Sequence, residues 1–548
     1  MIKLFLKEIF LMGLNRGLLI TFLGGSLFIL FFNLWGRTLV MMKHNRYAEV
    51  AKEMIQSGDW VVPRFNGEIY LHKPPFLFWL IALPSNIFGS VTPFLARLPS
   101  AFFAWIGGIV VYLWGRKIWG GERYGLISAG VLISSHLYFW QGRIARTDMV
   151  FSVLVLLSLY FFYLRYHEDT PDSPSPPPSP VKRLCRNSVH GSRASPRTDY
   201  DMLKINHLAV RPEPFDSPFV LSLSKDERFA QDRHVEGRMT NYDTVSKGRG
   251  RHRNYLLTGL SFLSMGLAGI TKGPVGLLLP LSVMTLFLLV KRELRLLIRR
   301  DFLSGYFVMT FVLGAWLVPF LSHVGWDQAL EVWQETKILT RQEPFYFYGY
   351  RIWIDFAPWS LFLPSLFIYY WRKERNQDEK FLILWFFGLF FFLTLFPFRA
   401  SKYLLPVFPA LALLMGGFWK NRSTTLFWVL FLCAITVWHG YEFKLVQGNE
   451  NRSRGILIEK ELRPFRRDIF FAYRMDIDIL GKINFYGDTV IPQVNRIKDL
   501  KREIGGEKEI LIITPQRVIE DLIQEGFHIT PVKIIEHKDT SFILGKIQ

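Results

Sequence analysis

Hydrophobic residues along this chain come in long uninterrupted blocks that short polar stretches separate. A helix that crosses a bilayer needs about 20 apolar residues, because its backbone must satisfy its own hydrogen bonds in lipid. Blocks of this kind predict spans near 17–35, 93–114, 125–141, 149–165, 255–271, 274–290, 303–321, 359–371, 380–398, 403–418 and 424–440. We therefore expect a polytopic α-helical membrane protein with about 11–13 spans.

Basic residues concentrate in alternate loops between these blocks. One set of loops contains GRKIWGGERYG, KRELRLLIRRD, WRKERNQDEK and KNR. Short loops rich in Lys and Arg remain in the cytoplasm, so the other set is predicted to lie outside: 36–92, 141–148, 271–274, 322–358, 398–403 and the tail from 441. Because the basic residues sit in these loops, the net charge of +20 is explained by membrane orientation and indicates no nucleic-acid partner.

The first outer loop, 36–92, is polar and has a helical period. In RYAEVAKEMIQSG, apolar side chains recur at Tyr47, Val50 and Met54, near the 3.6-residue repeat of an amphipathic helix. Gly58 predicts the end of that helix, and KPPFLFWLIALPSNIFG predicts a second helix that begins after its prolines. Amphipathic helices joined to spans tend to lie in the membrane interface. We therefore expect loop helices on the outer face.

Two other regions do not follow the pattern of the spans. The tail alternates helix-like NRIKDLKREIGG and PQRVIEDLIQEG with strand-like EILIIT and SFILGKI, which predicts a small α/β domain. Residues 167–253 are rich in Pro, Ser and charge and have no apolar period, which predicts a disordered cytoplasmic insert. The predicted division is a membrane domain at 1–440 and an outer domain at 441–548.

Ionisable residues gather at the outer ends of the spans, all on one predicted side of the membrane. Because such groups are costly at membrane depth, each of them is a candidate for function. The candidates are Arg46, Tyr47, Glu49, His72, Lys73, Asp148, Lys272 and Lys402. Together they predict an outward-facing cationic cavity with at least one carboxylate, which suits an anionic group such as a lipid phosphate.

Each candidate also has a purely structural explanation. Lys272 and Lys402 can extend to the interface without binding a ligand. Arg46 and Glu49 have the i, i+3 spacing of an ordinary helix-surface pair, and Asp148 fits the first turn of a span, where acids are common. No local feature separates the two explanations. Only the joint placement of these residues favours a site.

The stretches that contain these residues resemble a known family. RYAEVAKEMIQSGDWVVPRFNGEIYLHKPPFLFWL, RIARTDMVFSV, ITKGPVGLLLP and KYLLPVFPALALL are similar to lipid-dependent membrane glycosyltransferases of the GT-C type. Within the dolichyl-phosphate-mannose protein mannosyltransferase superfamily, the resemblance is to 4-amino-4-deoxy-L-arabinose (lipid A) transferases. It covers residues 1–440 without the insert and implies the GT-C fold.

This resemblance implies an enzyme, an inverting glycosyltransferase. It would move an aminoarabinose-like sugar, or another pentose or hexose, from a polyprenyl-phosphate donor to a lipid A-like or protein acceptor. The implied place is the bacterial inner membrane, with the active site facing the periplasm. Asp148 is implied to lie beside the reacting centre, and Lys73 to contact the donor phosphate. The implied substrate-binding residues are Arg46, Tyr47, Glu49, Lys73, Lys272 and Lys402.

The chain departs from the family where acidic residues are expected. Family members usually carry an Asp-Glu pair just before the xRY sequence, and the first of these is the leading catalytic acid. Lys43 and His44 occupy those positions. A charged Lys accepts no proton, whereas His44 can act as a base. The position before the KPP lysine, which often carries an acid in the family, is occupied by His72. Together, His44 and His72 raise the alternative of a divalent metal site.

Three explanations for the missing acids stay open. The acceptor needs less assistance from a base, or Asp148 or His44 takes over that role, or the chain is a catalytically impaired family member. A transporter or flippase of lipid-linked sugars would share the cationic cavity. It would also need polar groups on the inner half of the spans, and the sequence of the spans offers none.

Overall fold

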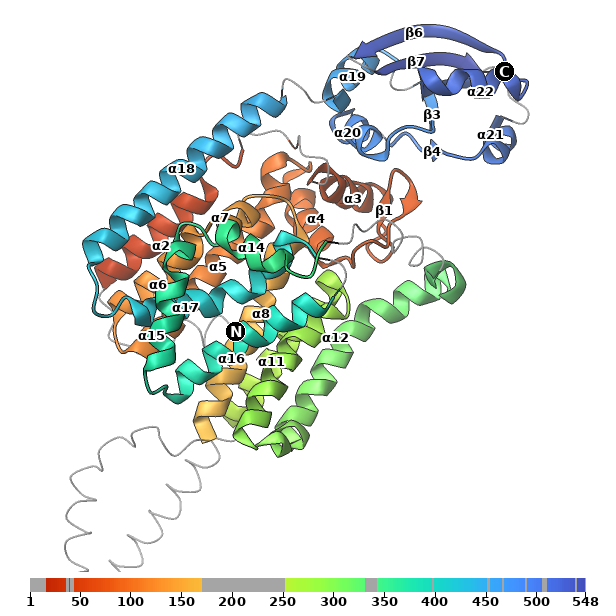
Figure 1. Ribbon diagram of the computed structural model, residues 1–548. Coiled ribbons are helices and arrows are strands. Elements are labelled where there is room, and N and C mark those ends of the chain that lie inside the picture. The colour runs from red at the N-terminus through yellow and green to blue at the C-terminus, as the bar shows by residue number, and fades with distance from the viewer. Residues whose placement is uncertain are drawn as a thin grey trace, which may run out of the picture. The chain divides into compact units, whose positions relative to one another are not determined.

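Figure 1 shows a computed structural model of the chain, which is mostly helical. The structure describes residues 16–35, 39, 44–169, 252–330, 343–396, 399–450, 454–465, 468–487, 490–504, 510–537 and 540–547. It divides into two compact units, one of Met1–Phe162 with Leu257–Gln548 and one of Tyr163–Leu256. The predicted insert at 167–253 lies outside the described residues except at its ends, where 167–169 and 252–253 are helical.

The membrane region consists of apolar helices of unequal length. Its helices are α2 (Arg16–Phe31), α5 (Pro93–Trp119), α6 (Glu122–Ser134), α7 (His136–Gly142), α8 (Thr147–Asp169), an unlabelled helix over 252–272, α11 (Val275–Lys291), α12 (Arg300–Val324), α14 (Phe347–Asp355), α15 (Leu363–Arg372), α16 (Gln377–Leu395), α17 (Phe408–Phe418) and α18 (Thr424–Glu450). Short 3₁₀ helices η1 (Leu294–Ile298), η2 (Trp359–Phe362) and η3 (Ser401–Val407) join some of them. Every residue of α17 is buried, because this helix packs against α5, α6 and α16.

Five helices of the described part are long and apolar enough to cross a membrane. They are Pro93–Trp119, Thr147–Glu168, Arg300–Val324, Ser401–Phe418 and Thr424–Lys444. The bent pair Phe347–Asp355 and Trp359–Arg372, with an angle of 115° between its helices, makes a sixth if it is one span. This number is below the 11 to 13 expected because several predicted spans are divided or short. The span predicted at 125–141, for example, is broken at Ser135, which has an extended backbone between α6 and α7.

The first outer loop contains the two expected helices. They are α3 (His44–Ser57) and α4 (Phe76–Phe88), with a hairpin of β1 (Arg64–Phe65) and β2 (Glu68–Ile69) between them. Gly58 ends α3 with φ +71°, a left-handed conformation that glycine adopts without strain. Gly89 ends α4 in the same way, with φ +80°. The end of α3 at Gly58 and the start of α4 after Pro75 agree with the sequence prediction, whereas the end at Gly89 was not predicted.

The tail forms a five-stranded mixed sheet with helices. Its elements are α19 (Arg454–Leu462), β3 (Ile469–Tyr473), α20 (Ile477–Gly487), β4 (Gln493–Val494), α21 (Ile497–Ile504), β5 (Ile510–Pro515), η4 (Gln516–Val518), α22 (Ile519–Gln524), β6 (Ile529–His537) and β7 (Thr540–Ile547). The strand order is β4-β3-β5-β7-β6; β3 pairs in parallel with β4 and β5, and β7 pairs antiparallel with β5 and β6. The strands predicted from EILIIT and SFILGKI are β5 and β7. Helix α18 runs past residue 440, and the domain boundary there stays a prediction.

The tail contacts the first outer loop through α20. Lys52 Nζ on α3 donates to Asn484 O at 2.7 Å, and Asn484 Nδ2 donates to Asn66 Oδ1 at 2.9 Å. Asn66 follows β1 and turns the hairpin with φ +55°. Polar groups from two distant parts of the sequence thus fix α20 beside α3.

Candidate functional site

Asp148 lies in the first turn of α8 and is 1% exposed. An acid there is favoured by the positive end of the helix dipole, so its location agrees with the structural explanation as well as with a site. Three cationic side chains surround it, more than one carboxylate needs for its charge to be balanced. Lys272 Nζ donates to Asp148 Oδ1 at 2.6 Å, Arg146 Nε lies 3.6 Å from Oδ2, and Lys402 Nζ lies 3.9 Å from Oδ2.

Both lysines lie at a helix terminus, Lys272 at the end of one helix and Lys402 near the start of another. The helix over 252–272 stops at Lys272, where Gly273 takes φ +81° and Pro274 starts the turn into α11. Lys402 lies in the 3₁₀ helix η3, just after the extended residue Ala400. Lys272 is 124 residues away from Asp148 in the sequence. The structure thus brings these three residues together, and their role in a site stays a prediction.

Aromatic rings line the other side of the two lysines. Lys272 Nζ lies 4.5 Å from the centre of the Phe151 ring and 4.6 Å from that of Tyr403, and Lys402 Nζ lies 5.4 Å from Tyr403. Ring faces attract cations, so the rings hold the ammonium groups at the edge of an apolar space. That space is a cavity of about 210 Å³, lined by Lys73 and Lys272 together with Phe151, Val275, Leu279, Tyr348, Phe392, Leu393, Phe396 and Tyr403.

The first loop contributes Tyr47 and Arg46 near this cluster. Burial raises the pKa of Tyr47 above its ordinary value; the phenol of Tyr70 and the carboxylate of Asp148 raise it further, while Arg146 and Arg46 oppose this. Tyr47 is therefore a neutral hydroxyl within electrostatic range of Asp148. Arg46 lies over the Phe65 ring, 5.4 Å from its centre. Glu49 is buried on the same helix, 4.0 Å from Lys52.

The structure shows little about the two histidines and the alternative of a metal site. His72 is exposed and its ring lies 5.1 Å from that of Tyr70. Lys43 and the side chain of His44 lie outside the described residues. Across the described ranges, no group of three or more His, Cys, Asp or Glu residues is placed to hold a metal ion. The metal role of His44 with His72 stays a prediction.

Two contributors to the site were missed from sequence. Arg146 faces Asp148 across the turn before α8, and the i, i+2 spacing in RTD was a signal that sequence reasoning left unused. Asp355 on α14 is fully buried and accepts a hydrogen bond from Ser401, the residue before Lys402. Arg351 pairs with Asp355 at 2.6 Å and donates to Ser401 Oγ at 2.9 Å. This group anchors the start of η3, and no local pattern could have indicated it.

Known proteins similar to this chain point to one family. A family model described as dolichyl-phosphate-mannose-protein mannosyltransferase matches residues 21–175. The undecaprenyl phosphate-alpha-4-amino-4-deoxy-L-arabinose arabinosyl transferase 1 of Pseudomonas fluorescens is 24% identical over 378 residues, which is 68% of this chain and 52% of that protein. The chain thus spans about half the length of curated relatives of this kind.

Solved structures show the same fold over nearly the whole chain. ArnT from Cupriavidus metallidurans in the apo state has a TM-score of 0.68 at 16% identity, covering 96% of this chain and 97% of ArnT. The same protein bound to undecaprenyl phosphate has a TM-score of 0.65 at 17% identity, covering 97% and 98%. The resemblance inferred from sequence is confirmed: this multi-pass membrane chain is related to GT-C glycosyltransferases of the ArnT and protein mannosyltransferase type and has their fold.

Proposed function

We propose that this protein is an inverting membrane glycosyltransferase that moves a sugar from a polyprenyl-phosphate donor to an acceptor hydroxyl at the outer face of the bacterial inner membrane. The observation that carries the proposal is the charge balance at Asp148. Three cations contact one carboxylate, which leaves two surplus positive charges beside a cavity with an apolar wall. A polyprenyl phosphate supplies an anionic head and an apolar chain, and so complements both features.

The cations have a direct chemical task in such a transfer. The acceptor oxygen attacks the anomeric carbon, the bond from that carbon to the phosphate oxygen breaks, and the polyprenyl phosphate leaves with the bonding electrons. A single displacement of this kind inverts the anomeric carbon. Lys73, Lys272 and Lys402 would stabilise the negative charge that grows on the leaving phosphate, which is where preorganised cations lower a barrier most.

Asp148 has two candidate tasks, and its contacts favour one of them. Its Oδ1 is occupied by Lys272 at 2.6 Å, while both neighbours of Oδ2 lie beyond hydrogen-bonding distance. Oδ2 thus keeps a lone pair that could take the acceptor proton. Yet the carboxylate is almost fully buried, so we propose that Asp148 mainly holds the lysines in place. His44 remains the other candidate base.

The decisive experiment is a transfer assay with the purified chain in lipid nanodiscs. Undecaprenyl-phosphate-linked 4-amino-4-deoxy-L-arabinose and other undecaprenyl-phosphate sugars serve as donors, with lipid A or a membrane-protein fraction as acceptors. We expect release of undecaprenyl phosphate that depends on the acceptor and is lost in Lys73→Ala. Lys444→Ala, at an exposed position of α18, is the matched control and should keep wild-type activity. The proposal fails if no donor is consumed, or if Lys73→Ala transfers sugar as the wild type does.

The task of Asp148 is tested in the same assay by its pH profile. If Asp148 only positions the lysines, Asp148→Asn lowers the rate by a similar factor at every pH. If Asp148 is the base, the variant also loses the acidic limb of the profile, since that limb would report titration of this carboxylate. A residual acidic limb in Asp148→Asn that disappears in His44→Gln would identify His44 as the base.

A further inference from the structure

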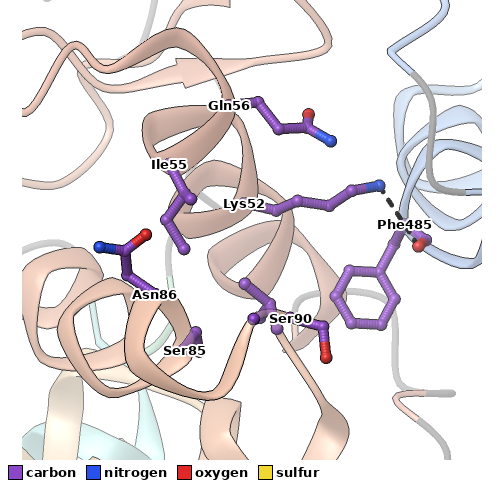
Figure 2. A pocket seen from close by; sticks show the side chains of 9 residues that line it. Lys52, Ile55, Gln56, Ser85, Asn86, Ser90 and Phe485 are labelled. Atoms are coloured by element: carbon purple, nitrogen blue, oxygen red, sulfur yellow. Dashed lines mark hydrogen bonds between the residues drawn. The ribbon is translucent and has the colours of Figure 1, made fainter.

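A second cavity, of about 370 Å³, lies between the first outer loop and helix α20 of the tail (Figure 2). Its lining comes from α3, from the end of α4 and the turn after it, and from α20: Lys52, Ile55, Gln56, Ser85, Asn86, Gly89, Ser90, Val91 and Phe485. None of these residues lines the cavity beside Asp148. A volume of this size falls within the range of about 300–1,000 Å³ that is typical of small-molecule sites.

The charge of this cavity is already neutralised. Lys52 is the one charged residue among its described lining, and its side chain is largely buried. Its ammonium donates to Asn484 O at 2.7 Å and to Phe485 O at 3.4 Å, as Figure 2 shows for Phe485. These carbonyls belong to the last turn of α20, where helix carbonyls lack helical partners and favour a cation. With Glu49 at 4.0 Å as well, Lys52 has no surplus charge for an anion.

The remaining polar groups are neutral, and one of them is buried without a partner. Ser85 is 0% exposed, and its Oγ has no hydrogen-bond partner among the described residues. Leaving a buried hydroxyl unsatisfied is costly, so a ligand hydroxyl that reached it would be favoured. Gln56, Asn86 and Ser90 stand at the exposed edge of the same cavity and offer both donors and acceptors.

Apolar surface completes the lining. The ring of Phe485 lies on the tail side, facing the turn that contains Ser90, and Ile55 lies on the α3 side (Figure 2). Sugar rings present hydroxyl groups along their edges and C–H groups on their faces. An aromatic ring beside amide and hydroxyl side chains matches both kinds of surface.

We propose that this cavity binds a neutral saccharide unit and that it holds a sugar of the acceptor while the transfer takes place at Asp148. The second part rests on the proposed transferase function. The binding of a saccharide does not rest on that function, because none of the residues that line this cavity belongs to the proposed transfer site. Residues of the tail and of the first outer loop line this cavity together, so the proposal gives the tail a role in recognising the acceptor.

Binding can be measured by saturation-transfer difference NMR on the full-length chain in micelles, with N-acetyl-D-glucosamine as the probe. Ser90→Trp places a large ring at the exposed edge and should weaken binding by at least about tenfold. Ile87→Trp is the matched control: it lies on the same helix end, is 82% exposed and does not line the cavity. It should bind as the wild type does, and both variants should melt at the wild-type temperature.

Three results would overturn the proposal: no transfer of saturation from the wild type to the sugar, equal binding in Ser90→Trp, or displacement of the sugar by inorganic phosphate, which would make this an anion site. Lys73→Ala separates the two proposals. It should bind N-acetyl-D-glucosamine normally while it fails to consume the lipid-linked donor. Sugar binding by a wild type that consumes no donor would refute the transferase and leave the saccharide cavity standing.

Discussion

Arg143 and Asp148 lie on one short segment, and both are buried, yet their charges are balanced in opposite ways. Arg143 Nε donates to Glu442 Oε2 at 2.9 Å, Nη1 donates to Ile29 O and Leu30 O at 2.9 Å, and Nη2 donates to Phe32 O at 2.6 Å. Its charge is matched by one carboxylate and its other donors are satisfied by the end of α2. This group ties α2 and α18 to the turn after α7.

Around Asp148 the balance is reversed. One carboxylate faces Lys272, Lys402 and Arg146, so positive charge is in excess. Of these residues, Lys272 also lines the neighbouring cavity. A buried charge without compensation is costly. A balanced pair therefore needs no further charge, whereas an unbalanced cluster would be stabilised by an anion. Charge balance, more than burial, separates a structural pair from a ligand site.

The largest expected effect is on folding, at the balanced pair. Arg143→Met leaves Glu442 buried without its partner and should destabilise the protein by about 3–5 kcal/mol. Thermal unfolding followed by tryptophan fluorescence in nanodiscs measures this. The double variant Arg143→Met/Glu442→Leu should recover only part of the loss, because it removes the unpaired carboxylate but does not replace the missing bonds to the carbonyls at the end of α2. If the single variant unfolds like the wild type, the pair has no structural role.

Next in size is the loss of transfer at the unbalanced cluster. Lys272→Met should lower kcat for sugar transfer by about 10²–10³-fold, because it removes one preorganised cation from the leaving phosphate. Adding Asp148→Asn should restore neither transfer nor thermal stability, because Arg146 and Lys402 would then face no carboxylate. Recovery of activity in the double variant would show that Lys272 serves only to neutralise Asp148.

A smaller effect is expected at Lys402. Its Nζ is 3.9 Å from the carboxylate, against 2.6 Å for Lys272, so it is less tightly held by Asp148. Lys402→Met should lower kcat/KM for the lipid-linked donor by about tenfold, mainly through KM, as expected for a contact that is similar in the ground state and the transition state. A loss as large as that of Lys272→Met would show that both lysines act on the leaving phosphate.

The smallest effect concerns a third buried charge, Glu53, which neutral groups satisfy. Its Oε1 accepts from Asn66 N at 2.6 Å and its Oε2 from Gly67 N at 3.0 Å. Burial nevertheless raises the pKa of Glu53 above its ordinary value. The folded state then holds the proton more tightly than the unfolded chain, so the stability contributed by protonation is present at low pH and is lost as pH rises through the raised pKa.

Unfolding measured from acid to neutral pH tests this. The wild type should lose stability relative to Glu53→Gln as pH rises through that window, because the variant cannot ionise there. Parallel curves for the two proteins would contradict a raised pKa. Either result shows how well backbone amides compensate a buried carboxylate, compared with the cations that face Asp148 and with Arg143, which faces its own carboxylate.

Sequence patterns predicted the local elements well. The period of Tyr47, Val50 and Met54 predicted α3, and Gly58 ends it in the left-handed conformation that only glycine adopts freely. These features depend on residues that are close in the sequence. The break at Ser135 was missed because apolar composition is the same on both sides of it, and composition carries no information about where a span bends.

The sequence alone predicted a multi-span helical membrane protein that resembles GT-C glycosyltransferases, with an α/β tail, and it placed the ionisable residues at span ends. Only the tertiary structure decided which of them meet. It brought Lys272 and Lys402 to Asp148, matched Arg143 with Glu442, and formed the cavity between α3 and α20. The physical reason is that periodicity reports the environment of each segment, whereas a charge is balanced by whichever side chain helix packing places within a few ångströms of it.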